Sequence, residues 1–82
     1  MTAEERKIWY RIEDVVIASG MTKVEIAKEG GFHRQSITYN PKANVLPSTR
    51  ILIAFCKVTG ASADWILGLE VYRLAQEERY DG

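Results

Sequence analysis

Residues 22–40, TKVEIAKEGGFHRQSITYN, carry the clearest folding signal in this chain. Thr22 can cap a helix, because its hydroxyl can accept a hydrogen bond from a free N–H of the first turn. Glu25 stands three residues later and completes a capping-box pattern. Gly30 and Gly31 end the helix, since glycine adopts the positive φ of a sharp stop without a steric penalty. The pattern predicts a short helix that runs into a tight turn.

A second helical segment follows this turn. Phe32 is apolar and buries the turn, and residues 34–40 resume with helix-compatible spacing. His33 stands where the segment begins and could cap it. Pro41 ends the segment, because proline removes a backbone donor and restricts the residue before it. These residues predict two short helices joined by a glycine turn.

Apolar residues recur at helical spacing on both sides of this pair. They predict a helix over residues 4–18 before it, and helices over 48–58 and 62–67 after it, capped by Ser48 and Ser62. Three neighbours in the last helix are candidates for the core: Trp65, Ile66 and Leu67. No alternation is long enough for a strand. We therefore predict a compact all-α domain of five helices over residues 1–69.

Residues 70–82 follow as a tail. Val71, Leu74 and Ala75 lie at helical spacing, which makes the tail a candidate sixth helix. Such a helix would pack on the domain or on a second subunit, where it would serve dimerisation.

Composition excludes several classes of protein. With 82 residues and 46 % apolar residues, the chain is predicted to form one globular domain. The single cysteine excludes an internal disulfide and a cysteine-based zinc site, and the single histidine excludes a paired-histidine metal site. No run of eighteen apolar residues exists, and the acidic start lacks a signal-peptide profile. We expect a cytoplasmic protein that does not span a membrane.

Enzymatic chemistry finds little support. Cys56 lies in the apolar run of residues 51–56, which predicts a buried side chain rather than a nucleophile paired with His33. Gly30 and Gly31 lack the downstream Gly-Lys-Ser/Thr of a P-loop. We expect no catalytic residue, no metal and no cofactor.

Three residues of the central stretch carry a family resemblance. Ala27, Gly31 and Ile37 stand at intervals of four and six residues. A small residue, a turn glycine and a branched aliphatic at these intervals resemble the lambda-repressor-like family, the Cro and phage-repressor type of helix-turn-helix. The resemblance covers residues 8–69. It implies that Ala27 lets two helices approach, that Gly31 permits the turn and that Ile37 locks the second helix in place.

Two positions depart from the family pattern. Gly30 stands where the family usually has a larger residue, which predicts an early end of the first helix. Asn40 and Pro41 stand where many members continue the second helix. We therefore expect a short second helix and a long loop over residues 41–47.

The resemblance implies which residues read DNA bases. Arg34, Gln35 and Thr38 match the base-reading positions of the family. If Ile37 faces inward, these residues and Tyr39 face outward, because neighbours one or two positions apart diverge on a helix. Arg34 can bond guanine O6 and N7, and Gln35 can bond adenine N6 and N7. We expect all four outward residues to reach bases in the major groove.

Other residues are candidates for phosphate contacts. Thr22 and Lys23 match the start of the first helix, which family members set against the phosphate backbone, and a helix N-terminus suits phosphate. Further candidates are basic or polar residues at the start of the second helix and beyond it: His33, Lys42, Asn44 and Arg50. The chain has no net charge, yet residues 21–50 hold five Lys or Arg against two Glu. A positive face of this kind can bind phosphate although the whole chain is neutral.

Two classes of function remain. The first is a sequence-specific, double-stranded DNA-binding transcriptional regulator of the phage-repressor type, a homodimer on two half-sites about one helical turn apart. The second is a protein-interaction module of the same fold, anti-repressor or antitoxin-like, with weak or no DNA binding. The resemblance carried by Ala27, Gly31 and Ile37 favours the first class, whereas the neutral net charge and the short second helix favour the second. Neither implies a small-molecule ligand.

Overall fold

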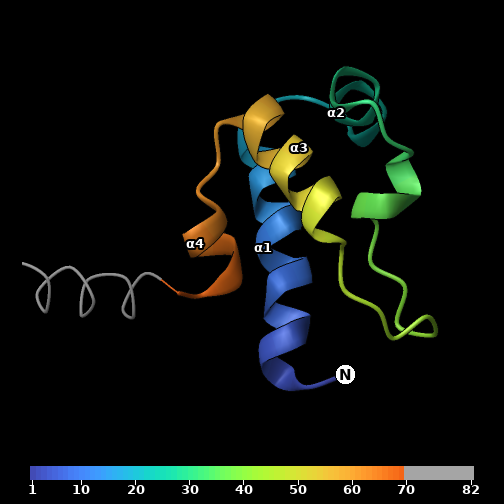
Figure 1. Ribbon diagram of the computed structural model, residues 1–82, viewed down its shortest axis with the longest axis vertical. Coiled ribbons are helices and arrows are strands. Elements are labelled where there is room, and N and C mark those ends of the chain that lie inside the picture. The colour runs from blue at the N-terminus through green and yellow to red at the C-terminus, as the bar shows by residue number, and fades with distance from the viewer. Residues whose placement is uncertain (70–82) are drawn as a thin grey trace, which may run out of the picture.

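The computed structural model describes residues 1–69, which are all-helical (Figure 1). Four α-helices and one 3-10 helix follow in the order α1 (Ala3–Ser19), α2 (Lys23–Gly30), η1 (Arg34–Ile37), α3 (Thr49–Thr59) and α4 (Ala63–Leu67). No strand occurs in this part of the chain. The all-α prediction is confirmed, and the tail of residues 70–82, with its candidate sixth helix, lies outside the described residues.

Each α-helix begins at a side-chain cap. The hydroxyls of Thr2, Thr22, Ser48 and Ser62 each accept a hydrogen bond from the backbone N–H three residues further on. Such caps satisfy a donor that the helix leaves unpaired, which is worth roughly 0.5–2 kcal/mol each. The predicted caps at Thr22, Ser48 and Ser62 are therefore confirmed.

The core lies where α1 and α3 meet the other elements. α1 runs through the middle of the molecule, with α4 on one side and α2 and η1 on the other (Figure 1). The core contains side chains from every helix, of which five are almost completely buried: Ile12, Ile26, Ile37, Phe55 and Ile66. Burial of each contributes roughly 1.5–3 kcal/mol relative to exposure. These side chains hold α2 and η1 at a defined place against the rest of the domain.

The Arg11 side chain of α1 makes polar contacts with α4 in addition to the core packing of Ile66. The Arg11 side chain donates a hydrogen bond to the Ile66 carbonyl at 3.4 Å, and its guanidinium lies 5.9 Å from the centre of a Trp65 ring. Ile66 is buried as predicted, whereas Trp65 and Leu67 are exposed, so their assignment to the core is wrong. A helix of five residues buries only one narrow face.

The third predicted helix, over residues 34–40, is wrong in length and in type. It is one 3-10 turn that ends at Ile37, and Thr38 is already extended at φ −107° and ψ 123°. The Thr38 hydroxyl donates to the Arg34 carbonyl, the group to which an α-helix would bond the Thr38 N–H. Because Asn40 precedes Pro41, the α conformation is sterically disfavoured for Asn40. The structure therefore has four α-helices in residues 1–69, not five.

The sequence predicts no membrane-spanning segment. None of the helices in residues 1–69 is long and apolar enough to cross a membrane.

Candidate nucleic-acid interface

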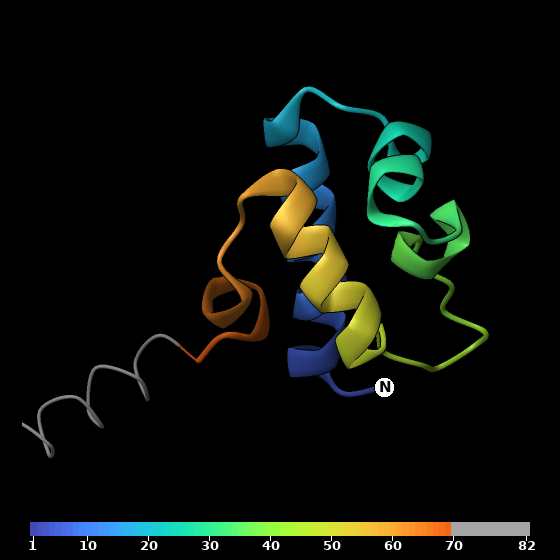
Figure 2. The ribbon, with the colours of Figure 1, turned by 45° about the horizontal axis from the view of Figure 1, so that its top comes forward.

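The first turn of α2 and the whole of η1 lie side by side on one flank of the molecule (Figure 2). Between them is a shallow cleft with six lining residues: Thr22, Lys23, Val24, Arg34, Gln35 and Thr38. Five of these six are residues that the sequence analysis predicted to contact DNA. No acidic residue lines the cleft. The fold thus gathers basic and polar side chains from two segments into one open surface, which is hereafter called the α2–η1 cleft.

The turn between α2 and η1 sets the geometry of this cleft. Gly31 has φ +73°, and the turn after α2 closes when the Phe32 N–H donates to the Ala27 carbonyl at 3.0 Å. Ala27 and Ile37 are buried, at 4 % and 1 % exposure. Ala27 and Ile37 are therefore buried on either side of a turn that has a left-handed Gly31.

Gly30 has a packing role that the sequence did not indicate. It is the last residue of α2, so the helix does not end before it. A Cβ at this position would collide with the Phe32 ring, which lies against the glycine. At Gly30 the resembled family usually has a larger residue, and here the Phe32 ring occupies the space that such a side chain would need.

The N-terminus of α2 presents free backbone donors to the cleft. The Thr22 N–H donates to the Glu25 carboxylate at 3.0 Å, and the Glu25 N–H donates to the Thr22 hydroxyl at 3.1 Å. Hydrogen bonds from Thr22 to the carboxylate lower the pKa of Glu25, and the bond from the Thr22 backbone is the largest cause. The N–H groups of Lys23 and Val24 make no hydrogen bond within residues 1–69. Free amides at the positive end of a helix dipole suit an anion such as phosphate.

The Lys23 ammonium already has a partner. Its Nζ lies 2.8 Å from a Glu13 carboxylate oxygen of α1, and both side chains are partly exposed. A partly exposed pair of this kind contributes roughly 0–1 kcal/mol. Lys23 must therefore exchange or share this partner to contact phosphate. Sequence reasoning missed Glu13, because nothing in a local pattern places α1 beside the start of α2.

His33 caps η1 as predicted. Its Nδ1 accepts a hydrogen bond from the Gln35 N–H at 3.1 Å, while the side chain remains exposed. Arg34 and Gln35 follow on η1, are exposed, and make no side-chain hydrogen bond within residues 1–69. Thr38 is exposed as well, with its hydroxyl bonded to the Arg34 carbonyl at 2.9 Å. Arg34 and Gln35 are therefore the side chains of η1 that line the α2–η1 cleft and are free to meet a ligand there.

Tyr39 does not face outward, so this part of the prediction is wrong. Its ring stacks against Trp9 with 6.0 Å between ring centres and meets the Tyr10 ring edge-on. Because the chain becomes extended at Thr38, the next side chain turns back toward the core. Tyr39 serves packing in the structure, not the α2–η1 cleft.

The loop from η1 to α3 carries the other predicted phosphate contacts. Lys42 and Asn44 are exposed there but do not line the α2–η1 cleft. The Asn40 side chain accepts a hydrogen bond from the Lys42 N–H at 3.0 Å, and Asn44 adopts a left-handed φ of +49°. Arg50, at the start of α3, is exposed and also lies outside the cleft lining. The structure separates these three residues from the five that it gathers at the cleft.

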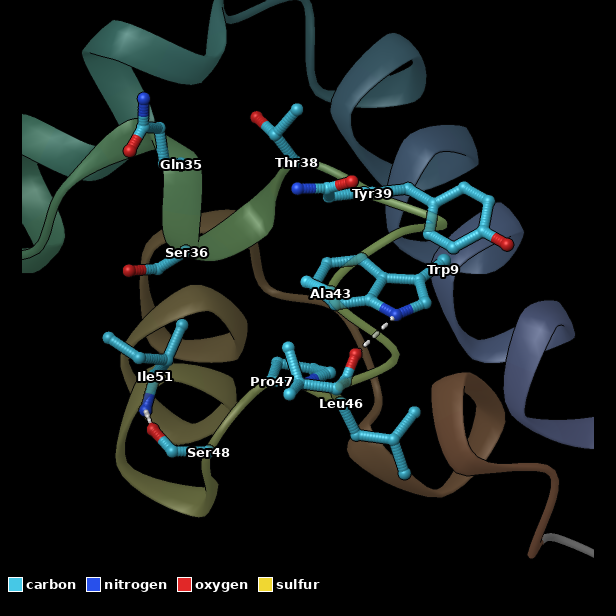
Figure 3. Close-up of a pocket in the computed structure, with 12 residues that line it drawn as sticks. Trp9, Gln35, Ser36, Thr38, Tyr39, Ala43, Leu46, Pro47, Ser48 and Ile51 are labelled. Atoms are coloured by element: carbon cyan, nitrogen blue, oxygen red, sulfur yellow. Dashed lines mark hydrogen bonds between the residues drawn. The ribbon is translucent and has the colours of Figure 1, made fainter. Parts of the chain in front are cut away.

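A second hollow lies beside η1 and shares Gln35 and Thr38 with the α2–η1 cleft (Figure 3). Its volume is about 690 Å³, and its walls come from α1, η1, the loop and the start of α3. The Trp9 indole N–H donates to the Val45 carbonyl at 3.1 Å and holds the loop beside α1 (Figure 3). No pattern in the sequence indicated this hollow, because it depends on where the loop folds back.

Metal and thiol chemistry find no new support in the described residues. No group of three His, Cys, Asp or Glu in residues 1–69 could hold a metal ion. Cys56 is partly buried, and this burial raises the pKa of its thiol, which disfavours the reactive thiolate.

Comparisons with known proteins return no match for this chain among family models, curated proteins or solved structures. The resemblance to lambda-repressor-like proteins therefore stays a prediction that depends on the motif residues.

Proposed function

We propose that this protein binds double-stranded DNA through the α2–η1 cleft and acts as a transcriptional regulator of the lambda-repressor-like type. One observation carries the proposal. Two separate segments bring Thr22, Lys23, Arg34, Gln35 and Thr38 into one open cleft that no acidic residue lines. A surface that combines cations, free amides and side chains with base-bonding geometry suits the DNA backbone and the base edges together.

The parts of the cleft have different roles in this proposal. The free N–H groups of Lys23 and Val24 and the Lys23 ammonium hold phosphate, and Arg34 and Gln35 contact bases. Because η1 has only four residues, few side chains reach the major groove. Useful affinity then requires two copies on two half-sites, which makes a homodimer part of the proposal.

The first test is binding of the full chain to a random-sequence duplex pool, measured by fluorescence anisotropy at low and at physiological salt. A protein that neutralises several phosphates loses affinity with a log–log salt slope of about −0.9 per phosphate. Sequencing of the bound fraction is expected to return a two-fold-symmetric motif. Absence of binding at low salt would contradict the proposal.

Matched variants locate the contact. Arg34→Ala is expected to cost about 1–3 kcal/mol on the selected sequence and to relax specificity at one base position. Lys57→Ala is the control, because Lys57 is an exposed cation of α3 that does not line the cleft. Lys23→Ala is expected to weaken binding to all sequences and to flatten the salt slope. Equal losses in the Arg34 and Lys57 variants would exclude η1 as the reading element.

A protein-interaction module is the second candidate, favoured by the short η1 and by the neutral net charge. Its apolar interface would be insensitive to salt. Absence of DNA binding at low salt, together with capture of a defined protein partner whose affinity survives high salt, would favour this alternative.

A further inference from the structure

We propose that the hollow between η1, the loop and α3 is a binding site for a neutral, planar small molecule. The hollow shares Gln35 and Thr38 with the α2–η1 cleft, but its other lining residues do not belong to that cleft (Figure 3). Its volume of about 690 Å³ is within the usual range of small-molecule sites, roughly 300–1,000 Å³. The site goes beyond DNA binding and requires no DNA to be occupied.

The absence of charge in the walls argues for a neutral ligand. None of the residues that line the hollow is Asp, Glu, Lys, Arg or His. A charged group that left water here would find no opposite charge, and an unpaired buried charge is costly. The hollow therefore selects against the anions that the α2–η1 cleft suits.

The aromatic wall argues for a planar ligand. Trp9 and Tyr39 stack with 27° between their ring planes and form one side of the hollow. Pro47 and Ile51 supply apolar surface on the side of α3 (Figure 3). Trp9 is only 5 % exposed, so a flat ring between these walls would gain apolar burial and would stack chiefly on the partly buried Tyr39 ring.

Two polar side chains of η1 make no hydrogen bond within residues 1–69 and can orient such a ring. Thr38, Asn40 and Ser48 also line the hollow, but their side-chain oxygens already bond to the backbone. The Gln35 amide and the Ser36 hydroxyl make no hydrogen bond within residues 1–69. Both belong to η1, so the ligand is expected to place a hydrogen-bonding edge toward η1 and its apolar body toward Trp9.

A ligand bound in the hollow would affect the α2–η1 cleft, because the two sites share lining residues. Gln35 and Thr38 line both the hollow and the α2–η1 cleft. A ligand bonded to Gln35 would compete with a base for the same amide. This consequence depends on the proposed function, whereas the binding site itself does not.

The test uses the indole N–H signals of the full chain in a proton–nitrogen correlation spectrum. The chain has two tryptophans, Trp9 in the wall of the hollow and Trp65 on α4. The probe is 2-quinolone, a neutral bicyclic lactam, and quinoline-2-carboxylate is its anionic counterpart. We expect 2-quinolone to move the Trp9 signal saturably, with half-saturation below about 1 mM, and to leave Trp65 unmoved. The carboxylate is expected to bind at least about tenfold more weakly.

Substitutions of residues in and outside the hollow test whether the probe binds there. Ala43 is exposed and lines the hollow, so Ala43→Phe should fill the site without loss of thermal stability and abolish the shift. Ala18→Phe is the matched control on α1 and should bind like the parent. Ser36→Ala should weaken binding about three- to tenfold through the lost hydrogen bond.

Three outcomes would overturn the proposal. They are no shift of the Trp9 signal, an equal shift of Trp9 and Trp65, or an unchanged shift in the folded Ala43→Phe variant. Because the readout contains no DNA, failure here leaves the DNA proposal standing, and failure of DNA binding leaves the ligand site standing.

Discussion

α2 and η1 lie side by side but are stabilised by different means. α2 has eight residues, a complete capping box at Thr22 and a left-handed glycine at its end. η1 has four residues, one N-cap bond from the Gln35 N–H to the His33 ring, and one C-cap bond from the Thr38 N–H to the Gln35 carbonyl. Each nevertheless buries one isoleucine almost completely. The difference indicates that local hydrogen bonds define α2, whereas tertiary packing holds η1.

This contrast matters for function, because the side chains proposed to read bases stand on the element with less local support. A single 3-10 turn has poorer hydrogen-bond geometry than an α-helix and is rarely stable alone. The placement of Arg34 and Gln35 therefore depends on the anchor beneath them, Ile37, and on the turn before them.

The largest expected effect comes from that anchor. Ile37→Ala should lower the free energy of unfolding by about 2–5 kcal/mol, because the side chain is 1 % exposed and its removal leaves a cavity. Thermal or urea denaturation measures the loss, and Ile26→Ala gives the matched value for α2. A loss below about 1 kcal/mol at Ile37 alone would show that η1 does not depend on packing.

The turn between the two elements comes next. Gly31→Val should destabilise the fold by roughly 1–3 kcal/mol, because a β-branched residue is strained at φ +73°. Nothing lies within 4 Å of an added Cβ, so the cost is conformational rather than steric contact. Gly31→Asn is the control, since asparagine tolerates the left-handed region, and equal losses in both variants would contradict this account.

Removal of the N-cap side chains is expected to have a smaller effect on stability, and one that differs between α2 and η1. Thr22→Ala should cost about 0.5–2 kcal/mol, as for other N-caps of α-helices. His33→Ala should cost less, because it removes one bond from a helix of four residues. Urea denaturation compares the two variants, and a larger loss at His33 would reverse the contrast between α2 and η1.

The smallest expected effect is a pH dependence of the stability that the Thr22–Glu25 capping box contributes. The folded pKa of Glu25 lies below its ordinary value of 4.5, because the carboxylate accepts the Thr22 N–H. The stabilisation that the ionised Glu25 carboxylate contributes is complete above pH 4.5. It is lost as pH falls through the folded pKa. Glu25→Gln should reduce this acid sensitivity of the melting temperature, with Glu29→Gln as the control. Identical acid profiles in the two variants would be inconsistent with the box.

Local patterns predicted the segments whose ends depend on local chemistry. Ser48 and Ser62 cap helices at the expected places, because a hydroxyl and the N–H three residues later form a bond that needs no distant partner. The burial of Ala27 and Ile37 agrees with what the family resemblance implied. Helical periodicity is a property of neighbouring residues, so it can be recognised in the sequence.

Distant contacts account for two features that local patterns did not indicate. Tyr39 turns inward because Trp9, thirty positions earlier, offers a ring to stack on. Lys23 is paired because α1 brings Glu13 beside it. Neither partner is marked by a motif, and both became evident only once the helices were packed together.

The bond from the Trp9 indole to the Val45 carbonyl also has an evolutionary consequence. It fixes the loop at one point, with Asn44 before that point and only Leu46 and Pro47 between it and the Ser48 cap of α3. Residues inserted next to Asn44 would extend an exposed segment, and loop-closure entropy rises slowly with length. Residues inserted after Val45 would shift α3 along α1 and disturb the core. Natural length variation in this lineage is therefore expected before Val45.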